Sequence, residues 1–267
     1  GDDWSFPVGT VVIKSFYYAT DRRRMEETAT LIETRLLIKS PEGDWKGHTY
    51  LWNADHTEAV RKVAGKRLAL NYVDQDGAEQ VQEYILPNTN QCKDCHQIDD
   101  RSRLLGVVGR QMDRLVERGG EQVAQLDWLA DAGLFGDAER PAVDHALVDP
   151  FGDASLDDRA RSYLDANCSH CHRPGGNGGP TGLVLLASER SPTKNGVCKG
   201  PVAAGPGSGD RRFDVVPGAP DESIFILRME STDPEVKMPE IPNRLPHEPG
   251  VELIREWIEN LPLTACD

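Results

Sequence analysis

Two stretches, CKDCH at residues 92–96 and CSHCH at residues 168–172, share the pattern Cys-x-x-Cys-His. This pattern is the attachment signature of c-type haem. Two thiols at this spacing can add to the two vinyl groups on one edge of the porphyrin, and the histidine that follows can bind iron. The sequence therefore predicts two covalently bound haem c (Fe) cofactors. The predicted attachment residues are Cys92, Cys95, Cys168 and Cys171, and the predicted iron ligands are His96 and His172.

Other uses of paired cysteines fit the pattern less well. A lone Cys-x-x-Cys pair can be a thioredoxin-like redox pair or half of a zinc site. Neither use needs a histidine directly after the second cysteine, and here one follows twice. The two pairs could share one zinc ion, but they lie 76 positions apart, beyond the usual zinc-ribbon spacing.

Composition excludes several classes of protein. The chain has 267 residues, of which 38% are hydrophobic, and a formal net charge of −14. That length suits one large domain or two small ones. No apolar run approaches the ~18–20 residues that a membrane span needs, so we expect no membrane span. The acidic balance and the absence of a basic block argue against binding to nucleic acid.

Cys198 and Cys266 are left over from the two motifs. Haem attachment of this kind takes place outside the cytoplasm, where disulfides also persist. We therefore expect a bridge between these two cysteines, with Cys198 as a thiolate ligand of iron as the alternative. We predict a periplasmic or extracellular location. The chain starts at Gly1 with no signal peptide, so the leader is expected to have been removed or omitted.

The second half of the chain carries three predicted helices. Residues 155–166 are amphipathic and follow a capping-box pattern at Ser155 and Asp158. Residues 249–261 form a second amphipathic helix, and residues 224–229 a short one. A Gly/Pro-rich stretch from residue 173 to about 220 cannot be regular helix.

The order helix, Cys-x-x-Cys-His, loop, Met-Pro, helix over residues 150–262 resembles a class I cytochrome c. The resemblance implies an all-α domain with His172 as proximal and Met238 as distal iron ligand. Thioether sulfur is a soft ligand that favours ferrous iron. The competing interpretation of Met238 is an ordinary core or loop methionine. His170 is expected to face solvent.

The first half is predicted to be a β-rich module. Strand patterns occur at residues 8–16, 31–38, 48–52, 67–72 and 80–86, with a hairpin turn at residues 74–77. Trp45, Tyr50 and Trp52 are expected in its core or at its rim. After the first motif, residues 101–118 and 122–132 read as helices, the first of them ended by Gly119 and Gly120, and residues 137–153 as a linker.

These patterns predict an α+β fold class in two domains. Residues 1–150 would form a small β-rich module with a helical haem-binding segment and the first haem c site. Residues 151–267 would form the all-α class I cytochrome c-like domain with the second site.

The distal ligand of the first haem is left open by the sequence. Met112 lies 16 residues after His96 on an apolar face, and ordinary core packing is its other interpretation. The remaining candidates are an open iron or one of three histidines, His48, His56 and His145.

Over its full length the chain resembles a family of exported bacterial dihaem cytochromes c. The matching segments are PVGTVVIKSFYY, IETRLLIKS, WKGHTYLWN, GVCKGPVAAG and RMESTDPEVKMPE. The resemblance implies a β-rich N-terminal region followed by a cytochrome c-like C-terminal domain.

The expected function is transfer of single electrons between redox partner proteins. The acidic surface would dock on a basic patch of a partner, although solubility explains the charge equally well. The alternative is a dihaem oxidoreductase, peroxidase-like or thiosulfate-oxidising, with one open or Cys-ligated haem. A redox or ligand sensor is a third interpretation. Whether the protein is an enzyme, and its oligomeric state, stay open at this point.

Overall fold

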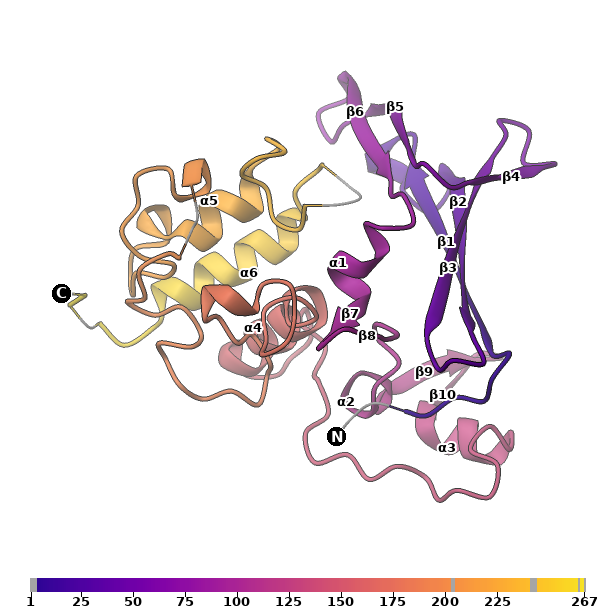
Figure 1. Cartoon of the computed structure of the whole chain (residues 1–267). Helices are drawn as coiled ribbons and strands as arrows, with labels where there is room; N and C mark the ends of the chain where they lie inside the picture. The colour runs from indigo at the N-terminus through magenta and orange to yellow at the C-terminus, as the bar shows by residue number, and fades with distance from the viewer. Residues whose placement is uncertain (1–3, 203–204, 241–243, 264, 267) are drawn as a thin grey trace.

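The first half of the molecule is built on a four-stranded antiparallel sheet whose strands follow one another in chain order (Figure 1). This computed structural model describes residues 4–202, 205–240, 244–263 and 265–266. The strands are β1 (Val11–Ala19), β2 (Ala29–Lys39), β3 (Trp45–Trp52) and β4 (Ala59–Lys62). A separate hairpin of β5 (Lys66–Val73) and β6 (Glu79–Leu86) packs on the sheet. The small core between them holds Ile32, Leu70, Tyr84 and Leu86.

The predicted strands of this half are confirmed, because β-branched and aromatic residues favour extended backbone. The predicted turn between β5 and β6 is also confirmed. The Asp74 carboxylate accepts the backbone N–H groups of Asp76 and Ala78 at 3.0 and 2.9 Å. Gly77 has φ +86°, a conformation that a glycine adopts without strain.

The segment between the two halves consists of short elements. The first motif forms α1 (Cys92–His96). It is followed by β7 (Gln97–Ile98), β8 (Arg101–Ser102), α2 (Gly109–Met112), β9 (Leu115–Arg118), β10 (Glu121–Ala124) and α3 (Gln125–Asp131).

The predicted helix over residues 101–118 is wrong. The chain instead enters the β9–β10 hairpin, whose turn is Gly119-Gly120. These glycines have φ of +60° and +86°, and two positive φ values in succession are what a two-residue type I′ hairpin turn needs. The helix predicted over residues 122–132 is confirmed in its central part as α3.

The second half contains the three predicted helices, which are α4 (Leu156–Cys168), α5 (Ile224–Glu230) and α6 (Glu248–Glu259). Ser155 caps α4, since its hydroxyl oxygen accepts the Asp158 backbone N–H at 3.2 Å and donates to the Asp158 carboxylate at 2.7 Å. The helices enclose a core that includes Ala160, Leu164, Ile226, Leu253, Ile254, Trp257 and Ile258.

Short 3-10 turns complete the regular structure of the described chain. They span Arg22–Arg24, Gly179–Thr181, Gly205–Ser208 and Pro220–Glu222.

The predicted fold class, α+β with an all-α class I cytochrome c-like second half, is wrong. The described chain is a mixed α/β structure with six short α-helices and several small antiparallel sheets, 24% helical. In the second half the chain between α4 and α5 forms isolated β-bridges, Val197 with Val215 and Phe213 with Ser223. Glycine and proline interrupt helical hydrogen bonding there, so loops supply much of this half.

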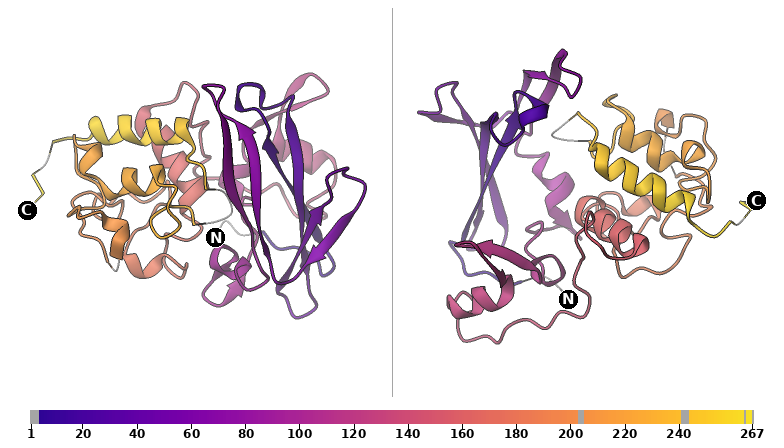
Figure 2. Two further views of the ribbon diagram at one scale, coloured as in Figure 1. Left: turned by 90° about the horizontal axis from the view of Figure 1, so that it is seen from above. Right: turned by 180° about the vertical axis from the view of Figure 1, so that it is seen from behind.

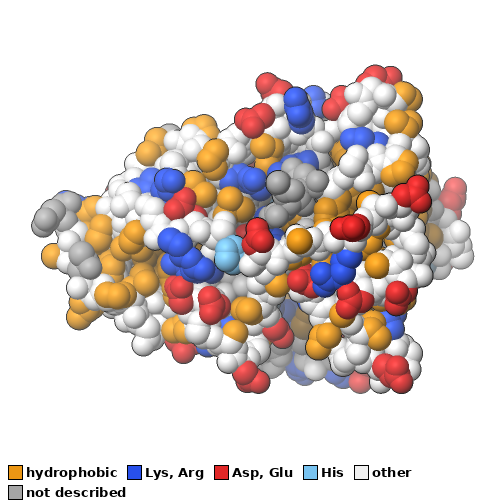
Figure 3. Space-filling view, turned by 90° about the horizontal axis from the view of Figure 1, so that it is seen from below, with side chains coloured by type: hydrophobic (Ala, Val, Ile, Leu, Met, Phe, Trp, Pro, Cys, Tyr) orange, Lys and Arg blue, Asp and Glu red, His pale blue; other side chains and the backbone are white. Residues whose placement is uncertain are grey.

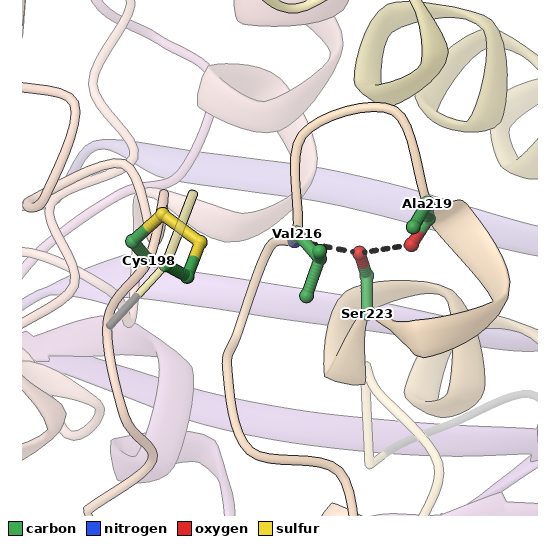
Figure 4. Close-up of a disulfide and its surroundings, with 5 residues drawn as sticks. Cys198, Val216, Ala219 and Ser223 are labelled. Atoms are coloured by element: carbon green, nitrogen blue, oxygen red, sulfur yellow. Dashed lines mark hydrogen bonds between the residues drawn. A yellow bond between two sulfur atoms is a disulfide. The ribbon is translucent and has the colours of Figure 1, made fainter. Parts of the chain in front are cut away.

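The predicted bridge between Cys198 and Cys266 is confirmed (Figure 4). The two Cα atoms lie 5.0 Å apart across 68 positions of sequence. The Ser223 hydroxyl fixes a neighbouring loop, since it accepts the Val216 N–H at 2.9 Å and donates to the Ala219 carbonyl at 3.0 Å. Because its sulfur is bridged, Cys198 is not a thiolate ligand.

The two halves lie side by side with α1 between the sheet and the helices, as the views of Figures 1 and 2 agree. A buried ion pair joins them: Arg110 Nε lies 3.0 Å from both carboxylate oxygens of Asp165, and their side chains are 12% and 1% exposed. The Leu147 N–H donates to the Arg110 carbonyl, and the Val148 N–H to the Ser162 hydroxyl. These contacts attach the segment before α4 to both halves.

Candidate functional site

The first motif is held directly under the sheet. The Asn88 side chain accepts the backbone N–H groups of Asn90 and Gln91 at 2.9 and 3.0 Å, which turns the chain into α1. On the other side, β3 passes close to the first thiol. A Cβ atom at Gly47 would lie only 3.4 Å from Cys92 Sγ. Strand β3 therefore lies within van der Waals range of the first motif cysteine.

His96 has the protonation pattern of an iron ligand. Its Nδ1 lies 3.0 Å from the backbone carbonyl oxygen of Arg103, which can only accept a hydrogen bond. Nδ1 must then carry the hydrogen, which leaves Nε2 with a free lone pair. Burial lowers the pKa of His96, so the ring is neutral at neutral pH.

His172 shows the same pattern through a side chain. The Thr181 hydroxyl donates its hydrogen to the Gly178 carbonyl at 2.6 Å, so toward His172 Nδ1, 3.3 Å away, it can only accept. Nδ1 again carries the hydrogen, and Nε2 is free to bind a metal. Burial, reinforced by the positive charge of Arg228, lowers the pKa of His172 to about 4.

The loop after the second motif packs tightly on the His172 ring. A Cβ atom at Gly178 would lie 2.8 Å from His172 Nδ1, which no side chain tolerates. The loop is fixed further by the Leu185 N–H, which donates to the His172 carbonyl at 2.9 Å. Both predicted proximal histidines are thus oriented by neighbours that fit an iron ligand.

The structure brings the two motifs together. The ligand atoms of Cys95, His170 and Cys171 lie within 4.8 Å of one another. Cys171 Sγ also lies 3.3 Å from the Asp94 carbonyl oxygen. The prediction that His170 faces solvent is therefore wrong, since its side chain is half-buried at this contact. The separation of 76 positions also does not keep the two cysteine pairs apart in space.

All four motif cysteines are free thiols in this structure. Burial raises the pKa of Cys92 and raises that of Cys168 to about 12. The pKa of Cys95 is lowered, because the hydrogen bond from Cys171 and the neighbouring His170 outweigh the effect of burial. Among these thiols, Cys95 is therefore the one that ionises most readily.

Charged side chains of the sheet face the first motif, and the sequence interpretation missed them. Glu33 is fully buried on β2, where its carboxylate accepts two hydrogen bonds from Arg35 at 2.9 and 2.5 Å and one from Tyr84. Lys14 on β1 lies directly opposite Arg35 on β2 in the register of the sheet. Burial lowers the pKa of Lys14, and the charge of Cys95 acts against this. The sheet therefore places cationic groups where the carboxylates of a first haem could pair with them.

A cavity of about 560 Å³ opens beside the first motif. Its walls include Trp4, Phe6 and Trp45, and the rings of Phe6 and Trp45 meet edge to face at 5.6 Å. Arg103, whose carbonyl orients His96, also lines it. Trp45 thus lines this cavity and is half-buried at the start of β3.

A buried lysine near the second motif has no counter-charge. Lys237 is 3% exposed, and no described residue gives its ammonium group a hydrogen bond or an ion pair. Burial lowers the pKa of Lys237, and the nearby positive charge of Arg244 lowers it further. A cation that is largely removed from water gains from an anionic partner, so a bound anion could pair with Lys237.

Met238 lies half-buried in the loop between α5 and α6, directly after Lys237. Its backbone N–H donates to the Arg228 carbonyl at 2.9 Å, and the charge of Arg228 acts on His172. In the same loop, the charge of Glu240 acts on Cys171. The loop that carries the predicted distal ligand therefore lies within electrostatic range of the second motif.

Met112 ends α2 and is half-buried. Its N–H donates to the Val108 carbonyl at 3.1 Å. The structure gives no contact that joins Met112 to His96, so its role as a distal ligand stays a prediction.

The surface in Figure 3 carries acidic and basic side chains interspersed with one another. This face does not present a patch of one sign for docking. Within the described ranges, no helix is long and apolar enough to cross a membrane.

In comparisons with known proteins, the sequence matches no family model, no curated protein and no solved structure.

Proposed function

We propose that the protein is a dihaem c-type cytochrome that carries single electrons between redox partners. One observation carries the proposal: both motif histidines are half-buried with a lowered pKa, and each has its Nδ1 hydrogen committed to an acceptor. Such a second-shell hydrogen bond is usual for metal-ligating histidines, because it fixes the ring and the tautomer. Two independent motifs with this arrangement favour two iron sites.

The chemistry of attachment is an addition without net oxidation. At each cysteine the S–H adds across one vinyl C=C bond, so a C–S bond and a C–H bond form while the π bond is lost. The four free thiols, Cys92, Cys95, Cys168 and Cys171, are available for this step. A bound haem iron supplies exchange of one electron between its ferric and ferrous states.

We assign Met238 as the distal ligand of the second haem, and the loop contacts with Arg228 support this position. Met112 remains our proposal for the first haem. With Cys198 bridged, a Cys-ligated thiosulfate-oxidising site loses support. The bridge and the attachment chemistry together support a periplasmic or extracellular location.

The decisive experiment is a pyridine haemochrome assay with intact mass on protein matured by a cytochrome c assembly system. We expect two haems per chain. Cys92→Ala with Cys95→Ala should leave one haem, and so should Cys168→Ala with Cys171→Ala. A wild-type chain that gains no covalent haem would overturn the proposal.

Ligation is tested by the optical spectrum of the oxidised protein. Methionine ligation gives a weak far-red charge-transfer band, which Met238→Ala should remove from the second haem while Met229→Ala leaves it. A large high-spin fraction at neutral pH would instead indicate an open iron and the oxidoreductase alternative.

A second candidate is one soft metal ion shared by the two motifs, because Cys95, His170 and Cys171 converge within 4.8 Å. Thiolate and imidazole ligands suit zinc. Metal analysis of the matured protein separates the two functions: one zinc per chain without haem would favour this site, and two haems without zinc would exclude it.

A further inference from the structure

We propose that the contact among Cys95, His170 and Cys171 joins the two attachment sites into one two-haem unit, in which an electron passes directly between the centres. This inference rests on the proposed function. It adds that no partner protein is needed between the first and the second haem.

The contact brings together the second cysteine of each motif. Ligand atoms of Cys95, His170 and Cys171 lie within 4.8 Å of one another. A thioether bond places a porphyrin edge directly on its sulfur atom. Cys95 and Cys171 with sulfur atoms this close would therefore hold the two attached edges near each other.

A backbone contact fixes the two motifs at this spacing. The Asp99 N–H donates to the Gly175 carbonyl at 3.1 Å. Gly175 has φ +77°, and a Cβ atom there would lie 2.3 Å from Asp99 Oδ1. Each of these residues lies three positions after the histidine of its motif, so the contact sets how closely the motifs meet.

A buried ion pair away from the motifs holds the same arrangement. Arg110 and Asp165 pair at 3.0 Å, and Asp165 belongs to α4, which leads directly into the second motif. The Ser169 hydroxyl inside that motif donates to the Asp165 backbone carbonyl at 2.8 Å. The spacing of the two sites is therefore built into the packing of both halves.

The transfer step is balanced within the chain. With haem held at both motifs, one iron would be oxidised from ferrous to ferric while the other would be reduced from ferric to ferrous, with no proton or further reactant. Single-electron partner proteins supply the electron at one site and remove it at the other.

The test is Soret circular dichroism of the matured protein, because two haems in close contact couple their transitions and give a paired positive and negative band. We expect this couplet in the wild type. Gly175→Ala should diminish it, since the new Cβ atom pushes Asp99 away. Adding Asp99→Ala should restore it, because all three atoms that the Cβ would meet belong to the Asp99 side chain.

Gly133→Ala is the matched control. Gly133 has φ +71°, and a Cβ atom there meets nothing within 4 Å, so the variant carries similar backbone strain without a clash. A couplet that persists in Gly175→Ala, or a single-signed band in a wild-type chain with two haems, would overturn the inference alone. Fewer than two haems would overturn the proposed function instead.

Discussion

Lys237 lies in the loop between α5 and α6 and carries a positive charge close to the proposed second haem site. The residue is 3% exposed, the described residues give it no ion pair, and it directly precedes the proposed ligand Met238. We expect Lys237→Met to lower the reduction potential of the second haem, because a nearby positive charge favours the reduced iron. A unit charge at ~10 Å in a medium of effective dielectric ~20 is worth about 1–2 kcal/mol, which corresponds to a shift on the order of tens of millivolts.

Potentiometric titration of both haems measures this shift. Lys46→Met is the matched control, since Lys46 is 62% exposed in a surface ion pair with Glu42. A second-haem potential that moves equally in both variants would argue against a propionate partner at Lys237.

At the level of elements, helices α4 and α6 pack closely where Gly250 of α6 faces Tyr163 of α4. A Cβ atom at Gly250 would lie 2.1 Å from Tyr163 Oη and 2.2 Å from its ring. An alanine in a helix normally adds up to ~1 kcal/mol of stability, but overpacking costs about 1–3 kcal/mol and sometimes more. We therefore expect Gly250→Ala to lower the free energy of unfolding in urea, whereas a stabilised variant would show that this crossing has room for a methyl group.

The turn between β1 and β2 predicts a dependence on pH. Asp21 accepts two side-chain hydrogen bonds from Arg23 at 2.9 and 2.8 Å, and this pairing holds the pKa of Asp21 well below its usual value. A lowered carboxyl pKa contributes stability above the unfolded value near 4, and this stability is lost as the pH falls further.

Urea unfolding of the wild type should therefore shift to lower midpoints as the pH falls from about 4 toward 2. Asp21→Asn should be less stable than the wild type at pH 7 and should show a shallower decline in acid. Parallel pH profiles for the two proteins would exclude Asp21 as a source of the acid sensitivity.

The sequence predicts a helix or strand correctly where its pattern of residue types is compatible with only one kind of secondary structure. Strands β1 and β2 are rich in β-branched residues, and α6 has a clear apolar face, so both types were found. Residues 101–118 were misread because Leu104, Val108 and Val116 mimic helical spacing, while Gly119-Gly120 serves as a hairpin turn rather than a helix end. The Gly119-Gly120 pair itself was the signal that could have identified the hairpin, because Gly-Gly is a typical two-residue hairpin turn.

For the whole molecule, the Arg110–Asp165 pair joins the two halves. Removing one partner of a buried ion pair leaves an uncompensated charge, which costs about 3–5 kcal/mol. We expect Arg110→Leu to destabilise the protein by this amount in denaturant unfolding. Arg140→Leu is the control, because Arg140 pairs with Asp113 at a more exposed position and should change stability by about 1 kcal/mol or less.

The candidate site could be predicted only in part, because some of its contacts depend on how the whole chain folds. The motif residues and the Cys198–Cys266 bridge follow from chemistry that sequence records directly. The approach of Cys95 to Cys171 depends on how two distant segments dock, which local spacing does not encode. The cationic groups Arg35 and Lys14 were missed for the same reason, since pairing between β1 and β2 decides which face they share.

The position of the Cys198–Cys266 bridge along the chain sets an order of events during biosynthesis. A ribosome makes a chain from its N-terminus, so both Cys-x-x-Cys-His motifs emerge before Cys266. Until Cys266 arrives, Cys198 lacks its native partner while four other thiols are present. In the proposed cytochrome, haem attachment before the bridge forms would cap those four thiols and would thereby protect Cys198 from mispairing.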